Sequence, residues 1–185
     1  MSADPTVVPQ LNGLFVGQDR RPDRLRPIEI HALSPFKRAL LVADGTVTQL
    51  IEAYTLEPIE VLCSAQQAQR LSAANSWLEL AAGDEIIDRH VVLQGRSNGL
   101  PYASAHSQVV PHRLPESIRQ GLICRNRGLG RLLIESQLET RRQLLWYGLV
   151  DEDGEECLSR TYLVWATGVP TMMISECFPL ERQTL

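Results

Sequence analysis

Two ionisable side chains lie on faces of predicted strands that are otherwise apolar. In residues 171–179, T-M-M-I-S-E-C-F-P, strand alternation places Glu176 on the same face as a methionine, an isoleucine and a phenylalanine. In residues 85–94, E-I-I-D-R-H-V-V-L-Q, Arg89 shares its face with isoleucine, valine and leucine. A charge in such surroundings is costly unless it is paired, solvated or protonated. Both side chains therefore need partners from elsewhere in the fold.

Two explanations fit this pattern. Arg89 and Glu176 could form a buried salt bridge that holds the sheet to its helices, or they could lie at opposite ends of a ligand pocket. Buried ion pairs contribute little to stability because desolvation offsets most of the Coulomb attraction. An apolar pocket with a guanidinium at one end and a carboxyl at the other would suit a small aromatic or dienyl acid, whose carboxylate the guanidinium binds bidentately.

Two helical pairs are predicted. Ser34-Pro35 is typical of a helix start, and Thr46 to Gln49 fits a capping box that opens a second helix after an Asp-Gly turn. A second pair is predicted over residues 114–122 and 131–136, with the Gly-Leu-Gly of residues 128–130 as its elbow.

The remaining periodic segments predict an antiparallel sheet. Strands are expected at residues 58–64, 85–94, 102–110, 138–150, 159–166 and 171–179. Residues 65–83 are expected to form a connection with some helix. Hairpin turns join most strands, which favours an α+β fold with a single antiparallel sheet over repeated βαβ units. Residues 1–27, with four prolines, are expected to form a partly extended arm, followed by one domain over residues 28–185.

The composition argues against several functional classes. The net charge of −4 gives no sign of a nucleic-acid surface, and no apolar run approaches the ~20 residues of a membrane span. With no secretory signal at its start, the chain is expected to be cytoplasmic with reduced thiols. Four cysteines without a C-x-x-C pair and four histidines without ligand-like spacing predict no metal site. His90 is expected at the surface, and His106 is considered for an approach to the site.

Five segments of the chain, taken in order, resemble the chorismate pyruvate-lyase family, which forms 4-hydroxybenzoate and pyruvate from chorismate. They are D-G-T-V-T-Q-L-I-E at 44–52, D-R-H-V-V-L-Q-G-R at 88–96, A-H-S-Q-V-V-P-H-R-L-P at 105–115, G-L-G-R-L-L at 128–133 and M-M-I-S-E-C-F-P at 172–179. No single segment is highly specific, but their order and spacing agree with the positions of the two unusual charges.

The resemblance implies a chorismate lyase-like fold, in which two helical hairpins close over an internal ligand pocket. It implies that Arg89 binds a substrate carboxylate and that Glu176 is catalytic. Leu129 matches a residue whose backbone contacts the ligand. Thr46 falls where the ubiquinone-pathway enzymes carry methionine, so that only a backbone contact would be kept. No metal or organic cofactor is implied.

The predicted activity is that of a carbon–oxygen lyase acting on chorismate. Arg89 would hold the ring carboxylate. Burial would favour the protonated form of Glu176, which would assist departure of the ether oxygen or hydrogen-bond the developing phenol. The product would feed quinone or related aromatic biosynthesis. We expect a monomer with chorismate and 4-hydroxybenzoate as its small-molecule partners, with no nucleic acid and no membrane span.

Two alternatives share these residues. One is a non-catalytic, effector-sensing domain of the same fold, which is disfavoured because only about thirty residues precede the first predicted helix, too few for a winged-helix domain. The other is a related chorismate-using enzyme with a different hydroxybenzoate product.

Overall fold

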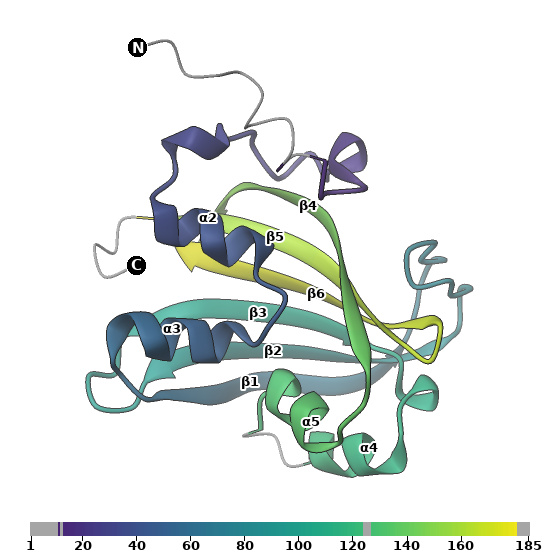
Figure 1. Cartoon of the computed structure of the whole chain (residues 1–185). Helices are drawn as coiled ribbons and strands as arrows, with labels where there is room; N and C mark the ends of the chain where they lie inside the picture. The colour runs from purple at the N-terminus through teal and green to yellow at the C-terminus, as the bar shows by residue number, and fades with distance from the viewer. Residues whose placement is uncertain (1–10, 12, 124–126, 181–185) are drawn as a thin grey trace.

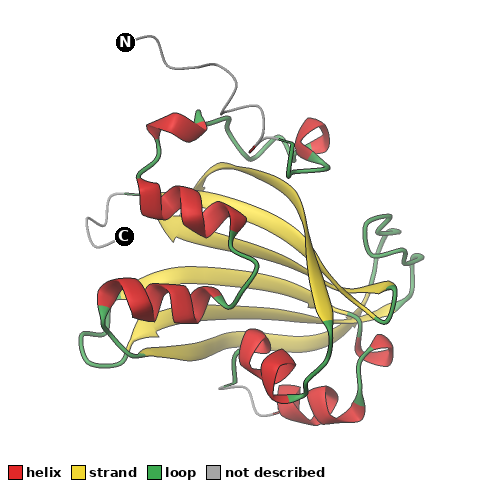
Figure 2. Ribbon diagram, in the orientation of Figure 1, coloured by secondary structure: helices red, strands yellow, loops and turns green. Residues whose placement is uncertain are grey.

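A single six-stranded sheet forms the framework of the protein (Figures 1 and 2). The computed structural model describes residue 11, residues 13–123 and residues 127–180. All strand pairs are antiparallel, in the order β1-β2-β3-β6-β5-β4, which confirms the predicted α+β class. The strands are β1 Ile59–Arg70, β2 Glu85–Gly95, β3 Pro101–Val109, β4 Thr140–Glu152, β5 Glu155–Ala166 and β6 Val169–Pro179.

The sheet consists of two meanders joined at a seam. Strands β1 to β3 follow one another directly, as do β4 to β6. The seam is the pairing of β3 with β6, in which Ala105 lies opposite Glu176 and Ser107 opposite Ile174. Residues far apart in the sequence are thereby placed side by side in the middle of the sheet.

The helices lie over one face of this sheet (Figure 1). They are α2 Pro35–Val42, α3 Val47–Thr55, α4 Glu116–Ile123 and α5 Leu129–Glu135, with short 3-10 turns at Gln18–Arg20, Ile30–Ala32 and Pro111–Arg113. In the described part of the chain, no helix is long and apolar enough to cross a membrane.

The two predicted helix starts have different outcomes. The Ser34 hydroxyl accepts a hydrogen bond from the Lys37 amide at 3.2 Å, which confirms the cap of α2. Thr46 does occupy the N-cap position of α3, but its hydroxyl makes no cap hydrogen bond and Gln49 is exposed. The capping box was therefore wrong, although the helix is present.

The core is divided between the two faces of the sheet. On the helical face, one apolar cluster includes Leu40 and Ile51 beneath α2 and α3, and a second includes Ile118 and Leu132 beneath α4 and α5. The opposite face buries a third cluster under residues 71–84 and the segment that contains Leu25. Both faces of the sheet are thus partly covered, by different kinds of structure.

Two predicted boundaries need correction, and the predicted N-terminal arm is only partly described. Residues 65–70 belong to β1, because Gln66 pairs opposite Arg89 and extends the ladder after a bulge near Ser64. Helix α5 begins at Leu129, inside the predicted elbow. In the N-terminal segment, residues 1–10 and 12 lie outside the described residues, and Arg26 forms a bridge with Leu149 on the β4 edge.

Candidate functional site

A cavity of about 740 Å³ lies between the helical face of the sheet and the two helical pairs. All four residues predicted for the site line it: Arg89, Glu176, Leu129 and Thr46. Its lining also includes Gln49 and Arg131, whose side chains are exposed, so the cavity reaches the surface beside the starts of α3 and α5. This volume is typical of small-molecule sites.

Arg89 is almost completely buried, at 2% exposure, on the wall that β2 contributes. Its Nε donates to Gln66 Oε1 at 3.0 Å, and its Nη2 donates to the carbonyl oxygen of Arg127 at 2.8 Å. Burial lowers the pKa of this guanidinium, an effect that the Cys63 thiol partly opposes. These contacts fix the plane of the guanidinium at the cavity wall, which is what bidentate recognition of a carboxylate requires.

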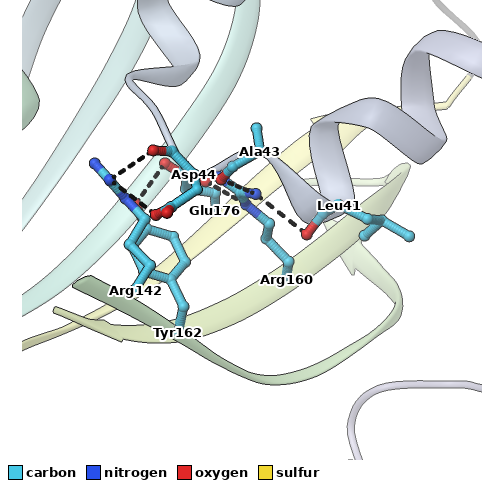
Figure 3. A network of polar contacts seen from close by, with 7 residues as sticks. All are labelled: Leu41, Ala43, Asp44, Arg142, Arg160, Tyr162 and Glu176. Atoms are coloured by element: carbon cyan, nitrogen blue, oxygen red, sulfur yellow. Dashed lines mark hydrogen bonds and ion pairs between the residues drawn. The ribbon is translucent and has the colours of Figure 1, made fainter. Parts of the chain in front are cut away.

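The partner of Glu176 is Arg160, on the neighbouring strand β5 (Figure 3). These two residues lie directly opposite each other in the β5–β6 register. Arg160 Nε donates to Glu176 Oε2 at 2.7 Å, and the Tyr162 hydroxyl donates to Oε1 at 3.1 Å. Of the two explanations for the unusual charges, the salt bridge between Arg89 and Glu176 does not form, because Glu176 pairs with Arg160 instead. The backbones at residues 89 and 176 lie about 12 Å apart, separated by two strand spacings and an offset of two residues.

Arg160 has no exposed surface and is the most deeply enclosed charge of the site. Burial alone would lower the pKa of its guanidinium, but the Glu176 carboxylate and the Tyr162 hydroxyl offset this, and the pKa is raised. Burial, with Glu176 beside it, also raises the pKa of Tyr162, so this phenol stays a hydrogen-bond donor. Both oxygens of Glu176 thus accept hydrogen bonds from β5, one from the Arg160 guanidinium and one from the Tyr162 hydroxyl.

Within the described residues, three buried polar atoms at or beside the cavity have no hydrogen-bond partner. They are Thr46 Oγ1, Arg142 Nε and Arg160 Nη2; Thr46 and Arg142 line the cavity, and Arg160 adjoins it through Glu176. Arg142 Nη1 donates to the Asp44 carbonyl and carboxylate oxygens at 3.2 and 3.4 Å (Figure 3), and Arg142 lines the same cavity as Glu176. An unsatisfied buried donor costs about 1–3 kcal/mol, so an anionic oxygen placed here would relieve an existing cost.

The starts of α3 and α5 approach each other closely at the cavity. A Cβ atom on Gly130 would lie 2.6 Å from Thr46 Cγ2, so only glycine fits against the threonine methyl. This contact holds Leu129, which is 7% exposed, against the cavity. Thr46 thus has a packing role in addition to its unpartnered hydroxyl.

Sequence reasoning missed Arg160, Tyr162 and Arg142. Alternation along residues 158–164 places Arg160 between apolar side chains on one face, the same signal that marked Arg89 and Glu176. His106, considered for the site, instead pairs opposite His90 and adjoins a groove on the other face of the sheet.

Comparison with known proteins identifies a family of similar sequences. A family model described as chorismate pyruvate-lyase Rv2949c-like matches residues 41–185. Chorismate pyruvate-lyase of Mycobacterium leprae is 26% identical over 161 residues, covering 81% of this chain and 77% of its own length. The protein of the same name from Mycobacterium tuberculosis is 26% identical over 165 residues, covering 81% of this chain and 82% of its own length.

Solved structures share the fold at low sequence identity. The effector domain of PhnF from Mycobacterium smegmatis aligns with a TM-score of 0.57 and 12% identity, covering 76% of this chain and 92% of that domain. The C-terminal domain of the histidine utilization repressor from Pseudomonas syringae aligns with a TM-score of 0.52 and 14% identity, covering 69% of this chain and 95% of that domain. These likenesses concern the framework, whereas the family match covers most of the sequence, including every residue of the cavity described above. The chain belongs to the Rv2949c-like chorismate pyruvate-lyase family.

Proposed function

We propose that this protein eliminates pyruvate from chorismate to give 4-hydroxybenzoate, without a cofactor, in the cavity between the sheet and the two helical pairs. The observation that supports this most directly is the presence of two separate arginines in the lining of one cavity, Arg89 and Arg142, together with Glu176, which Arg160 holds from outside the lining. Chorismate carries two carboxylates, one on its ring and one on its enolpyruvyl group, and needs two such positions.

Arg89 binds the ring carboxylate in this proposal. Its guanidinium is held by Gln66 and the Arg127 carbonyl before substrate arrives, so little ordering is left to be done on binding. The ring then points along the helical face towards β6. The unpartnered Nε of Arg142 and Oγ1 of Thr46, on two residues that line the cavity, become the donors for the enolpyruvyl carboxylate and the ether oxygen.

Glu176 acts as a carboxylate in this pose. With Arg160 and Tyr162 donating to its two oxygens, it accepts a further hydrogen bond from the ring hydroxyl of chorismate and fixes the ring for elimination. The ether carbon–oxygen bond breaks, the ring carbon that bears the hydroxyl loses its hydrogen, and the enolpyruvyl methylene gains a proton. Aromatisation of the ring supplies the driving force.

The test is to incubate the purified chain with chorismate, to identify the aromatic product by chromatography and to measure pyruvate with a coupled dehydrogenase. Equal amounts of 4-hydroxybenzoate and pyruvate are expected. Arg89→Ala should lose at least about 100-fold in kcat/KM, the equivalent of a charged hydrogen-bond pair of ~3 kcal/mol. Glu176→Gln should lower kcat strongly and change KM much less. Matched controls are the exposed Arg70→Ala and Glu85→Gln, which leave the cavity untouched.

Other outcomes separate the rival functions. Unchanged chorismate together with tight binding of a hydroxybenzoate would favour a ligand-sensing domain over a lyase. A different hydroxybenzoate isomer would identify another chorismate-using enzyme. Near-wild-type turnover in both Arg89→Ala and Glu176→Gln would remove the mechanism.

A further inference from the structure

The sheet face opposite the cavity carries a second cluster of chemically active side chains, formed by Asp88, His90 and His106. Alternation along β2 places Asp88 and His90 on the face that Arg89 avoids, and the β2–β3 register places His106 directly opposite His90. Side chains directly opposite on neighbouring strands have Cβ atoms about 4.5–5.5 Å apart. Sheet pairing alone therefore brings these three groups together.

The two imidazoles converge on one carboxylate. His90 Nε2 lies 3.2 Å from Asp88 Oδ1, and His106 Nε2 lies 2.8 Å from Asp88 Oδ2. The rings stack with centroids 4.2 Å apart and planes 13° from parallel. One ligand atom from each residue lies within 4.8 Å of the others.

These distances are close to what a metal ion requires. A tetrahedral Zn²⁺ ion with bonds of about 2.0–2.2 Å holds its ligand atoms roughly 3.4 Å apart. Side-chain rotations alone can close the remaining distance, because the backbone of both strands is already fixed by the ladder. A hydrogen-bonded cluster would also satisfy the carboxylate. It would not, however, require two imidazoles with both Nε2 atoms directed at the same carboxylate.

Exposure distinguishes this cluster from a closed structural network. The side chains of His90 and His106 are 50% and 37% exposed, whereas that of Asp88 is 13% exposed. An ion bound here would have solvent on its outer side and room for water at the remaining coordination positions. Both histidines also line the groove on this face, which would give the ion a route of entry.

We propose that Asp88, His90 and His106 form a binding site for a divalent transition-metal ion, with Zn²⁺ as its representative, on the face opposite the substrate cavity. Two imidazoles and one carboxylate with open positions suit Zn²⁺ or its neighbours in the transition series, and do not suit Mg²⁺ or Ca²⁺, which need more oxygen ligands. The site is independent of the lyase proposal. Asp88 and His90 flank Arg89 on β2, and His106 lies on β3. A bound ion would therefore join the two strands and stabilise the strand that carries the cavity arginine.

Zn²⁺ binding to chelator-treated, reduced protein tests this site, measured by calorimetry and by competition with a chromophoric indicator. One ion per chain is expected, with no comparable binding of Mg²⁺. The double variant His90→Gln/His106→Gln and the single variant Asp88→Asn should each weaken binding at least about tenfold. The double variant of two exposed histidines elsewhere, His31→Gln/His112→Gln, should bind as the wild type does.

Two further measurements do not depend on activity. Co²⁺ should give a visible d–d spectrum in the wild type that the His90→Gln/His106→Gln variant lacks. Zn²⁺ should raise the wild-type Tm by at least about 3 °C and leave the Tm of that variant unchanged. Circular dichroism of metal-free variants establishes that they fold. No stoichiometric Zn²⁺ in the wild type, or equal affinity in the wild type and in the folded His90→Gln/His106→Gln variant, would overturn the proposal.

Discussion

The pairing of Arg160 with Glu176 leads to a quantitative prediction for a double-mutant cycle. Arg160 is fully buried and Glu176 is 9% exposed, so removing one charge leaves the other without compensation. Breaking a buried pair in this way typically costs about 3–5 kcal/mol. We expect the lower end for Glu176→Gln, about 3 kcal/mol, because the glutamine oxygen can still accept from Arg160 Nε and the cavity admits water beside it.

The cost of removing Arg160 has a second part. Its Nη1 also donates to the carbonyl oxygens of Leu41 and Ala43 at 3.2 and 3.1 Å, where helix α2 ends. Arg160→Met should therefore lower the free energy of unfolding by about 4 kcal/mol, because both the carboxylate and these carbonyl oxygens lose their hydrogen-bond donor. The double variant Arg160→Met/Glu176→Gln leaves no unpaired charge and loses mainly the carbonyl contacts, so its free energy of unfolding should be about 1–2 kcal/mol lower than that of the wild type. The coupling free energy between the two residues is then about 5–6 kcal/mol.

Urea unfolding at neutral pH, followed by tryptophan fluorescence, measures each of the four free energies of unfolding. The denaturant m-value should be the same for all four proteins, so that the cycle compares stabilities and not changes in the unfolded state. A double variant that costs the sum of the two single variants, about 7 kcal/mol, would refute the reasoning. It would show that the two side chains contribute independently and that the carboxylate is not held by the guanidinium.

Three more predictions follow from contacts of the same site and its surroundings. Gly130→Ala should lower Tm and kcat/KM because its Cβ meets Thr46 Cγ2, and Thr46→Ser in the same chain should restore much of both by removing that methyl. Arg89→Lys should raise KM about tenfold with a smaller change in kcat, since an ammonium cannot bind a carboxylate bidentately. Burial raises the pKa of Cys177 to about 12, so the folded chain keeps a thiol proton that the unfolded chain releases above pH ~9. The contribution of this thiol to the free energy of unfolding should be fully present below pH 9 and should be lost as the pH rises towards 12. Urea midpoints from pH 8 to 10.5 should fall less steeply in Cys177→Ala than in the wild type or in Cys63→Ala.

Strand alternation was sufficient to predict much of the sheet. Hairpin turns and period-two patterns located most strands, and Ser34 correctly predicted the start of α2. Residues 65–70 were missed because their glutamines and alanines have weak strand propensity. They become a strand through pairing with residues 85–90, a tertiary effect that local sequence does not contain.

The candidate site was predictable in its parts but not in its pairing. Alternation identifies which charged side chains face the apolar side of a strand, and it marks Arg160 as clearly as Arg89 and Glu176. It does not say which strands are neighbours. For this reason a salt bridge between Arg89 and Glu176 stayed one of two alternatives and Arg160 was missed. The β5–β6 hairpin, and not the distant β2, supplies the partner of the carboxylate.

The same limit applies to the histidines. Sequence spacing showed no metal-ligand cluster, because Asp88 and His90 are separated from His106 by a hairpin. The register of that hairpin carries the missing information, since it alone decides that His106 lies opposite His90. A shift by one residue would have turned His106 to the other face of the sheet.

The seam between β3 and β6 brings the parts of the cavity together. Each meander of the sheet is a local structure, but the cavity belongs to neither: Arg89 comes from one, while Arg160 and Glu176 come from the other. Strand β3 connects them across the seam, with Ser107 opposite both Arg89 and Ile174 and with Ala105 opposite both Val91 and Glu176. Backbone hydrogen bonds fix the two meanders against each other, whatever side chains face the cavity. The charged pair on the second wall depends on one hairpin, because the register of β5 with β6 places Arg160 directly opposite Glu176.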